Sequence, residues 1–475
     1  MSSSRKGLRA RNLGLALVLT FIGSLQLQAW TEPGLTPEVR EKIDRLAQRS
    51  LEQTGVPSAA LAIVKDGQIA YLQAYGMARL DPKVPARPPM RYSIGSISKQ
   101  FTAAAILMLA EQGKVSLDDR VGKYLPNLTR ANEVTIRQLL SHTSGYQDYW
   151  PQDYVPPFMT QPVTAEGILD RWARKPLDFD PGTRWQYSNT NYVIAGVIVE
   201  KVGGKPLLQF LQEHMFGPLG MQGVDNIDLH GLGEADATGY MRYGLGPLRV
   251  APKEGPGWLF AAGELAMPAE ELAKWDVGII SRSVLKPASH REMETEVKLK
   301  NGSGTGYGLG LQLGNVAGHR LVRHGGEVSG FVAQNLVFPD DRLAIVVLTN
   351  QDASSAASTI ARQIATLMLT PANPAAAGKR EQMRKIFLDL QQGRIDRSLF
   401  TENANAYFTA QAIQDFAASL APFGEPLDFT QSGEQLRGGM IFRRYTAAFG
   451  ARTLEITTYE MPDGKLEQFL VSSDN

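Results

Sequence analysis

Hydrophobic and polar positions near the start of the chain predict one helix followed by paired strands. Apolar residues recur at helical spacing after Thr36-Pro37, a pair suited to the cap and first turn of a helix, which predicts a helix over 37–53. Two strand-like runs follow at 58–64 and 68–75. Asp66-Gly67 separates them and favours the positive φ angles of a hairpin turn, so a sheet is expected to begin here.

Further along, the pattern predicts a buried helix and then a return to strands. Residues 98–112 are rich in apolar helix formers and end before Gly113, which suits a C-terminal cap. Strand-like runs occur at 320–324, 331–338 and 343–348, and an alanine-rich helix follows over 353–369. The run at 343–348 is almost continuously apolar, as in a central strand covered on both faces. We therefore predict an α+β fold, with an antiparallel sheet flanked by helices and an all-helical and loop subdomain.

The last hundred residues have a pattern of their own. Residues 371–378 are rich in Pro, Ala and Gly and resemble a linker. Beyond them the sequence predicts helices over 380–392 and 404–420 and strands over 427–431, 440–447, 453–461 and 466–471. The expected organisation is a main domain over 30–370 and a small α+β accessory domain over 379–475, which is within the usual size range of domains.

The first residues are typical of a signal peptide rather than of a folded element. Four basic residues precede an apolar run of 13 residues over 13–25, and a plausible cleavage region follows at 26–29. This run is shorter than the roughly 20 residues that a membrane-spanning helix needs, and no other candidate occurs downstream. We expect a signal peptide over 1–29, a periplasmic or secreted protein and no membrane span after its removal. Leu27 stands where a small residue is usual, which leaves a retained anchor as the alternative.

Composition and charge exclude several classes of protein. The 475 residues include no cysteine, so disulfides and thiolate metal sites are absent. The six histidines form no H-E-x-x-H motif, and neither a metal nor another cofactor is expected. Residues 1–29 carry four basic and no acidic side chains, so the rest of the chain has 45 basic and 48 acidic residues, a formal charge of −3. This charge argues against nucleic acid as a partner.

Ser96 and Lys99 form the candidate nucleophile and base. A serine hydroxyl needs a neighbouring group to take its proton, and a lysine three residues later lies one turn along the same face of a helix. For that lysine to act as a base, burial or a neighbouring cation must lower its pKa. Two other S-x-x-K matches exist, Ser3 to Lys6 and Ser283 to Lys286, but neither begins a long apolar helix. Only Ser96 to Lys99 has the structural context that the chemistry requires.

Two further short motifs could complete a site. Tyr187-Ser188-Asn189 is the one Y-x-N in the chain, and its tyrosine could relay a proton while Ser188 or Asn189 caps a helix through 193–202. His324-Gly325-Gly326 follows a strand-like run, and its glycines would let a substrate backbone approach that strand closely. Taken singly, the first motif is better explained by packing and helix capping, and the second is also compatible with a turn.

Together and in this order, the three motifs resemble the active-site signature of the serine β-lactamase and penicillin-binding-protein superfamily. The similarity is greatest to the class C-like branch, which includes esterases, D-amino-acid peptidases and carboxypeptidases. Other segments that resemble family landmarks are 92–96, 139–145, 218–221, 307–310 and 337–339. The resemblance extends over about 55–352.

This resemblance implies roles for eight residues. Ser96 would be acylated by a small-molecule or peptide substrate, and Lys99 and Tyr187 would act as base and then acid, in an order left open. Asn189 would orient Lys99 or the substrate, and His324, Gly325 and Gly326 would bind substrate. The backbone N–H groups of Ser96 and Glu327 would hold the oxyanion. The implied function is that of an exported serine hydrolase that acts through an acyl-enzyme on an ester, a D-amino-acid peptide or a related amide.

Some residues depart from the family pattern or allow two readings. His324 stands where true β-lactamases usually have lysine, so a cation for a substrate carboxylate would depend on pH, which favours esterase or peptidase activity. Glu264 stands where relatives often have glycine. His142 is either a catalytic group or, as we favour, a residue that holds a turn. The aromatic and proline-rich segment 146–158 is either a loop that gates a pocket or surface packing.

Rival functions remain open to different degrees. An α/β-hydrolase is disfavoured because no G-x-S-x-G occurs. The alternative from another class is a non-hydrolytic penicillin-binding sensor or scaffold, in which Ser96 is acylated without turnover. The C-terminal domain shows no acid, base or metal constellation, and a homo-oligomer formed through it is one possible role.

Overall fold

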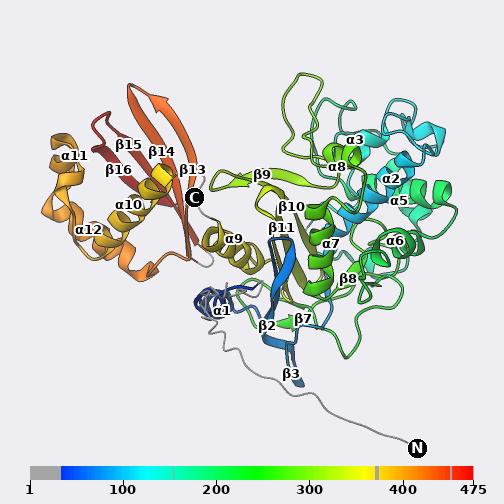
Figure 1. The fold of residues 1–475 in the computed structure, drawn as a ribbon, viewed down its shortest axis with the longest axis horizontal. Helices are drawn as coiled ribbons and strands as arrows, with labels where there is room; N and C mark the ends of the chain where they lie inside the picture. The colour runs from blue at the N-terminus through cyan, green and yellow to red at the C-terminus, as the bar shows by residue number, and fades with distance from the viewer. Residues whose placement is uncertain (1–33, 153, 370–373, 450–451, 474–475) are drawn as a thin grey trace, which may run out of the picture. The chain divides into compact units, whose positions relative to one another are not determined.

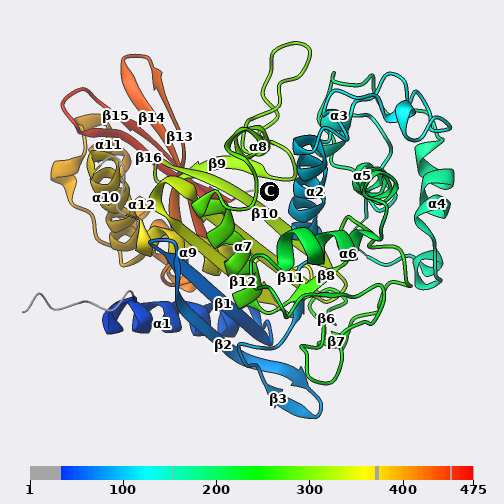
Figure 2. The same ribbon diagram turned by 45° about the vertical axis from the view of Figure 1, so that its right-hand side comes forward.

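The computed structural model describes residues 34–475 except 153, 370–373, 450–451 and 474–475. A seven-stranded antiparallel sheet lies at the centre of the main domain, in the order β3-β2-β1-β12-β11-β10-β9. Its strands are β1 (Ser58–Lys65), β2 (Gln68–Leu80), β3 (Lys83–Pro85), β9 (Gln312–Val316), β10 (His319–Val328), β11 (Phe331–Phe338) and β12 (Leu343–Thr349). Strands from both ends of the domain therefore pair with each other, as β1 pairs with β12 (Figure 2).

Local sequence explains how this sheet begins. Asp66 and Gly67 both have positive φ angles, 55° and 78°, and connect β1 to β2 as the predicted hairpin. The helix α1 (Pro37–Thr54) precedes them, with Thr36 as its N-cap and Gly55 in the left-handed conformation at its end. All seven residues of β12 are buried, which confirms the prediction of a central strand covered on both faces.

Two separate cores cover the two faces of the sheet. On one face α1 and α9 (Ala356–Met368) pack against β12 and its neighbours, in a core that includes Leu61 and Ile345. On the other face α7 (Ala269–Ser281) packs against β1 and β12, in a core that continues through α2 (Ser98–Glu111). Figure 1 shows α7 and α9 on opposite sides of the sheet.

Helices and loops form the region between the two groups of strands. Its helices and short 3₁₀ or π turns are η1 (Gly95–Ile97), α2, η2 (Val121–Lys123), α3 (Ile136–Leu140), η3 (Pro157–Thr160), α4 (Ala165–Ile168), η4 (Leu169–Ala173), α5 (Asn189–Gly203), α6 (Leu207–Leu211), η5 (Gln212–Phe216), α7 and α8 (Pro287–Met293). Short strands also pair here: β4 (Tyr92–Ser93), β5 (Asp225–Asn226), β6 (Tyr240–Met241), β7 (Arg249–Val250) and β8 (Leu265–Met267). The helices α2 and α5 lie side by side (Figure 2).

The C-terminal residues form the predicted small α+β domain. Its four-stranded antiparallel sheet has the order β13 (Asp428–Arg437), β14 (Met440–Phe449), β15 (Arg452–Glu460) and β16 (Leu466–Ser473). Its helices are α10 (Pro374–Gln391), α11 (Glu402–Tyr407) and α12 (Ala410–Leu420), with the 3₁₀ turns η7 (Arg397–Leu399) and η8 (Ala421–Phe423). Sheet and helices share a core of their own, which includes Phe387 and Tyr445.

Several predicted bounds differ from the structure. The helix expected over 404–420 is two helices, because Thr409 caps α12 by accepting a hydrogen bond from the Ala412 N–H and so ends α11 before it. The helix α10 begins at Pro374 rather than at 380, within the predicted linker. The strands β3 and β9 were not predicted, and β10 continues past 324 to Val328. The proposed signal peptide over 1–29 and part of the linker lie outside the described residues.

The described residues contain neither a membrane-spanning helix nor a metal-binding cluster. No helix in that part of the chain combines the length and hydropathy that a membrane crossing requires. No group of three or more histidine or carboxylate side chains in the same residues is arranged to hold a metal ion.

Candidate active site

Ser96 lies in the turn η1, where the chain passes from β4 into α2, and its side chain is partly exposed. The strand β10 touches this turn backbone to backbone. A Cβ atom on Gly326 would lie 1.8 Å from the Ile94 carbonyl oxygen and 3.1 Å from the Ser96 nitrogen, and one on Gly95 would lie 2.8 Å from the Glu327 nitrogen. Gly326 is therefore required by the chain's own contact between β10 and η1, a reason that the sequence did not reveal.

Lys99 is fully buried one turn after Ser96. Its Nζ lies 2.9 Å from the Ser96 Oγ, 2.8 Å from the Asn189 Oδ1 and 2.7 Å from the Ala262 carbonyl oxygen. The amide and carbonyl oxygens can only accept hydrogen bonds, so they take two N–H groups of a neutral amine and leave its lone pair for the Ser96 hydroxyl. Burial lowers the pKa of Lys99 to about 7, although the charge of Asp148 opposes this shift.

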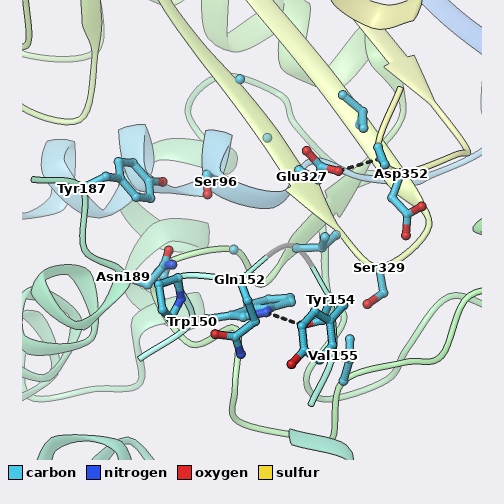
Figure 3. A pocket seen from close by; sticks show the side chains of 18 of the residues that line it. Ser96, Trp150, Gln152, Tyr154, Val155, Tyr187, Asn189, Glu327, Ser329 and Asp352 are labelled. Atoms are coloured by element: carbon cyan, nitrogen blue, oxygen red, sulfur yellow. Dashed lines mark hydrogen bonds between the residues drawn. The ribbon is translucent and has the colours of Figure 1, made fainter. Parts of the chain in front are cut away.

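Tyr187 enters the site from the segment before α5. Its hydroxyl is buried, makes no hydrogen bond to the described residues and points toward Ser96 (Figure 3). Burial raises the pKa of Tyr187 above its ordinary value, and the nearby Ser96 hydroxyl opposes that rise. The tyrosine therefore keeps its proton at neutral pH.

Asn189 and Asp148 form the wall that fixes Lys99. The Asn189 side-chain amide donates to the Asp148 Oδ1 at 3.1 Å, which leaves its carbonyl oxygen directed at Lys99. The Asp148 Oδ1 also accepts from the backbone N–H groups of Asn189 at 3.0 Å and Trp150 at 3.2 Å. Sequence reasoning missed Asp148, which lies inside the aromatic segment 146–158. It also expected a capping side chain for α5, but Ser188 stands at the N-cap without such a hydrogen bond.

His324 lines the site but presents no cation to it. Its Nδ1 lies 2.5 Å from the Gly325 carbonyl oxygen and its Nε2 lies 2.8 Å from the Tyr307 hydroxyl. A carbonyl can only accept, so Nδ1 carries the proton and Nε2 accepts the proton of Tyr307. Burial lowers the pKa of His324 to about 3, and the Lys99 charge acts in the same direction. The imidazole is therefore neutral at any pH near 7.

Glu264 and His142, whose roles the sequence did not determine, are both buried near this site. Glu264 accepts a hydrogen bond from the Asn226 side-chain amide, and burial raises the pKa of Glu264 to about 8. Burial also raises the pKa of the neighbouring Asp228 to about 7. His142 is fully buried between Tyr187, Tyr192 and Tyr307, and its Nδ1 accepts from the Ser188 N–H at 3.2 Å.

A large pocket opens above Ser96, with a volume of about 1250 Å³. The segment 146–158 forms part of its wall, where Trp150 and Tyr154 are held together by a hydrogen bond from the indole N–H to the Tyr154 carbonyl at 2.8 Å (Figure 3). Tyr146 and Tyr149 of the same segment are buried. The eight predicted site residues all lie in or beside this pocket: Ser96, Tyr187, Asn189, His324, Gly325, Gly326 and Glu327 line it, and Lys99 contacts Ser96 from below.

Comparison with known proteins gives the family. A family model described as Beta-lactamase matches residues 43–368. The chain belongs to the β-lactamase family. This membership confirms the resemblance inferred from the three motifs, and the mixed fold with its antiparallel sheets agrees with it.

Individual relatives share about two thirds of this β-lactamase-family chain. Protein flp of Staphylococcus aureus (strain MW2) is 30% identical over 326 residues, which cover 66% of this chain and 64% of that protein. D-aminopeptidase of Cereibacter sphaeroides is 30% identical over 312 residues, which cover 64% of this chain and 58% of that protein. The chain thus matches about three fifths of the length of these curated relatives.

One solved structure matches nearly the whole chain. The octameric penicillin-binding protein homologue from Pyrococcus abyssi aligns with a TM-score of 0.63 and 23% identity, over 91% of this chain and 99% of that one. At this identity the likeness shows the fold, and its coverage extends into the C-terminal domain.

Proposed function

We propose that this protein is a serine hydrolase that forms an acyl-enzyme at Ser96 with an ester, a D-amino-acid peptide or a related amide. The observation that carries this proposal is the buried Lys99 amine, 2.9 Å from the Ser96 oxygen and with its pKa lowered to about 7. A general base is most effective when its pKa lies near the working pH. A lysine that only stabilised the fold would not need this combination of burial and contact.

The proposed chemistry follows from the state of each group. The neutral Lys99 amine accepts the Ser96 proton while the serine oxygen attacks the substrate carbonyl. The backbone N–H groups of Ser96 and Glu327, on the two segments that meet at Gly326, stabilise the charge on the carbonyl oxygen. Tyr187, protonated and directed at Ser96, passes a proton to the leaving group and recovers one from the Lys99 ammonium, which restores the neutral amine. Water then attacks the acyl-enzyme and gives a proton to Lys99. That proton returns to the Ser96 oxygen as the acid leaves.

The neutral His324 supports a substrate without a carboxylate at this position. β-Lactams and C-terminal D-alanyl peptides carry a carboxylate, and an imidazole whose pKa is about 3 offers no positive charge to pair with it at neutral pH. Amides, esters and amino-terminal residues of peptides have no such requirement. The D-aminopeptidase among the relatives supports the same substrate class. We therefore favour D-amino-acyl amides or esters over β-lactams.

Export and assembly belong to the proposal as well. The basic and apolar pattern of residues 1–29 supports a periplasmic or secreted location. Assembly of copies through the C-terminal domain is supported by the octameric homologue, whose alignment covers that domain. Size-exclusion chromatography with light scattering on chains with and without residues 378–475 tests the assembly.

A steady-state assay with a chromogenic short-chain ester and D-amino-acid anilides tests the activity. We expect continuous turnover by the full chain and its loss in Ser96→Ala. A single stoichiometric burst without turnover would instead support the sensor or scaffold, and turnover that survives Ser96→Ala would refute the assignment of the nucleophile. The same assay with a cephalosporin tests the substrate preference, since efficient β-lactam hydrolysis would contradict it.

A further inference from the structure

His142 is a buried residue beside the candidate active site, with an unusual backbone conformation and one unpaired ring nitrogen among the described residues. It is fully buried, and its backbone has a φ angle of 58°, a left-handed conformation that is uncommon for residues with a side chain. Its Nδ1 accepts the Ser188 backbone N–H at 3.2 Å, with the Asn191 amide at 3.4 Å. Because Nδ1 is an acceptor, the proton of the neutral ring lies on Nε2, which has no hydrogen-bond partner among the described residues.

The acceptor bond of His142 fixes the backbone between two residues of the site. Ser188 is flanked by Tyr187, whose hydroxyl points toward Ser96, and by Asn189, whose amide oxygen holds Lys99. At the start of α5, the Ser188 backbone N–H is donated to the imidazole of His142. A shift of this peptide would move the phenol and the lysine partner together.

The ring of His142 also supports the phenol directly. Its centroid lies 4.3 Å from that of Tyr187 and 5.0 Å from that of Tyr307, the residue whose hydroxyl binds His324. Burial holds the pKa of His142 well below its ordinary value, and positive charge on Lys99 acts in the same direction. The ring therefore stays neutral and keeps the Nδ1 lone pair that Ser188 needs.

We propose that His142 is a positioning residue for the acylation of Ser96. Through Nδ1 it fixes the Tyr187-Ser188-Asn189 backbone, and through its ring it fixes the Tyr187 phenol. His142 does not itself line the substrate pocket, so it acts through these neighbours. The inference rests on the proposed hydrolase function and adds to it a residue that determines rate rather than affinity.

His290 provides a matched control. It is fully buried, and its Nε2 accepts the Leu285 backbone N–H at 3.2 Å, the same length as the bond at His142. It lies in α8 and does not line the pocket. Replacing either histidine with phenylalanine therefore removes a buried imidazole and one backbone hydrogen bond, but only one of the two supports Tyr187.

The experiment compares His142→Phe and His290→Phe by steady-state kinetics on the same ester, per mole of folded full-length protein. We expect kcat to fall by about 10- to 100-fold in His142→Phe with a smaller change in KM, because small displacements of catalytic groups cost rate. His290→Phe should lose thermal stability and keep its kcat. The midpoint of the pH profile should stay the same in both variants. Equal kcat values would overturn the inference.

A second pair of variants covers the case in which His142→Phe does not fold. In His142→Asn the side-chain oxygen can replace Nδ1, and asparagine tolerates the left-handed backbone; in His142→Gln the oxygen lies nearer the position of Nε2. We expect His142→Asn to recover part of the rate that His142→Gln loses. Equal rates in these two variants would refute the role of Nδ1. If the unmodified chain shows no turnover on any substrate, the proposed function fails first, so the two failures are distinguishable.

Discussion

The two faces of the seven-stranded sheet bury different kinds of side chain. Every buried side chain of α1 and α9, on one face, is uncharged. The other face buries Lys99, His324 and Asp276, and burial shifts the pKa of each toward its neutral form. Apolar burial stabilises the fold, whereas an ionisable group without full compensation costs stability and is retained for another reason. We therefore expect substitutions on the first face to change stability and those around Lys99 to change rate.

The largest expected effect is at Lys99 itself. Lys99→Met keeps an unbranched stem as far as Cε but removes the amine 2.9 Å from Ser96. The kcat for ester hydrolysis should therefore fall by about 10³- to 10⁴-fold, the upper range for loss of a general base. Stopped-flow or steady-state assays with far-ultraviolet circular dichroism as the folding control measure this. A rate within tenfold of the unmodified chain would remove the distinction between the faces.

On the face of the sheet covered by α1 and α9, a cavity should lower the free energy of unfolding without changing the rate. Ile345 in β12 is fully buried in the core formed with α1 and α9, and Ile345→Ala should reduce the free energy of unfolding by about 2–5 kcal/mol. The kcat per folded molecule should stay unchanged. Urea denaturation followed by activity assays tests both parts, and a large loss of kcat in fully folded protein would show that this face also controls the chemistry.

The two glycines after His324 should differ although they are adjacent. A Cβ at position 326 would collide with the Ile94 backbone, so Gly326→Ala must displace β10 from the Ser96 turn and lower the rate by about 10- to 100-fold. At position 325 the nearest atom, at 2.9 Å, belongs to the flexible Gln334 side chain, which can move. Gly325→Ala should therefore cost much less rate. Equal losses in parallel kinetic assays would contradict the packing argument.

The smallest effect tests the electrostatics of Lys99. The Asp148 charge raises the pKa of Lys99 against the larger effect of burial, so Asp148→Asn should move the rising limb of the profile of kcat/KM against pH to lower pH. Asp178→Asn, which changes an equal charge outside the pocket lining, is the control and should leave the limb in place. A shift of the rising limb to higher pH in Asp148→Asn would contradict this account of the Lys99 pKa.

Local patterns in the sequence were sufficient to predict most of the helices and strands and to select Ser96 as the candidate nucleophile. Short-range patterns determine a hairpin turn, a helix start and a buried strand, at Asp66-Gly67, Thr36-Pro37 and 343–348. Each depends only on residues close together in the sequence, so it could be predicted before the fold was known. The spacing of Ser96 and Lys99 is likewise a property of one helical turn. The division into domains over 30–370 and 379–475 remains a prediction.

The rest depended on contacts between distant segments. The sequence could not show whether His324 is charged, because its surroundings are set by the fold. Its two ring nitrogens form hydrogen bonds with the Tyr307 hydroxyl and the Gly325 carbonyl only in the folded chain. Asp148 binds Asn189 across 41 positions, and Ala262 reaches Lys99 with a backbone carbonyl that has no sequence signature. The reason for Gly326 was also hidden, because it lies in the approach of β10 to Ile94.

Two carboxyl groups near the site also have raised pKa values, about 7 for Asp228 and about 8 for Glu264. They would titrate in the same pH range as Lys99. A profile recorded in Glu264→Gln separates Glu264 from Lys99, because the limb that belongs to Lys99 should persist there.

The pH dependence of kcat/KM for a neutral ester tests the central claim most directly, since it reports the ionisations of the free enzyme. Deprotonated Lys99 is the active form, so kcat/KM should rise with pH and level off above a midpoint near 7, where the pKa of Lys99 lies. A midpoint near 10.5, the ordinary lysine value, or a rate that falls as the pH rises through 7, would contradict a neutral Lys99 amine as the base for Ser96.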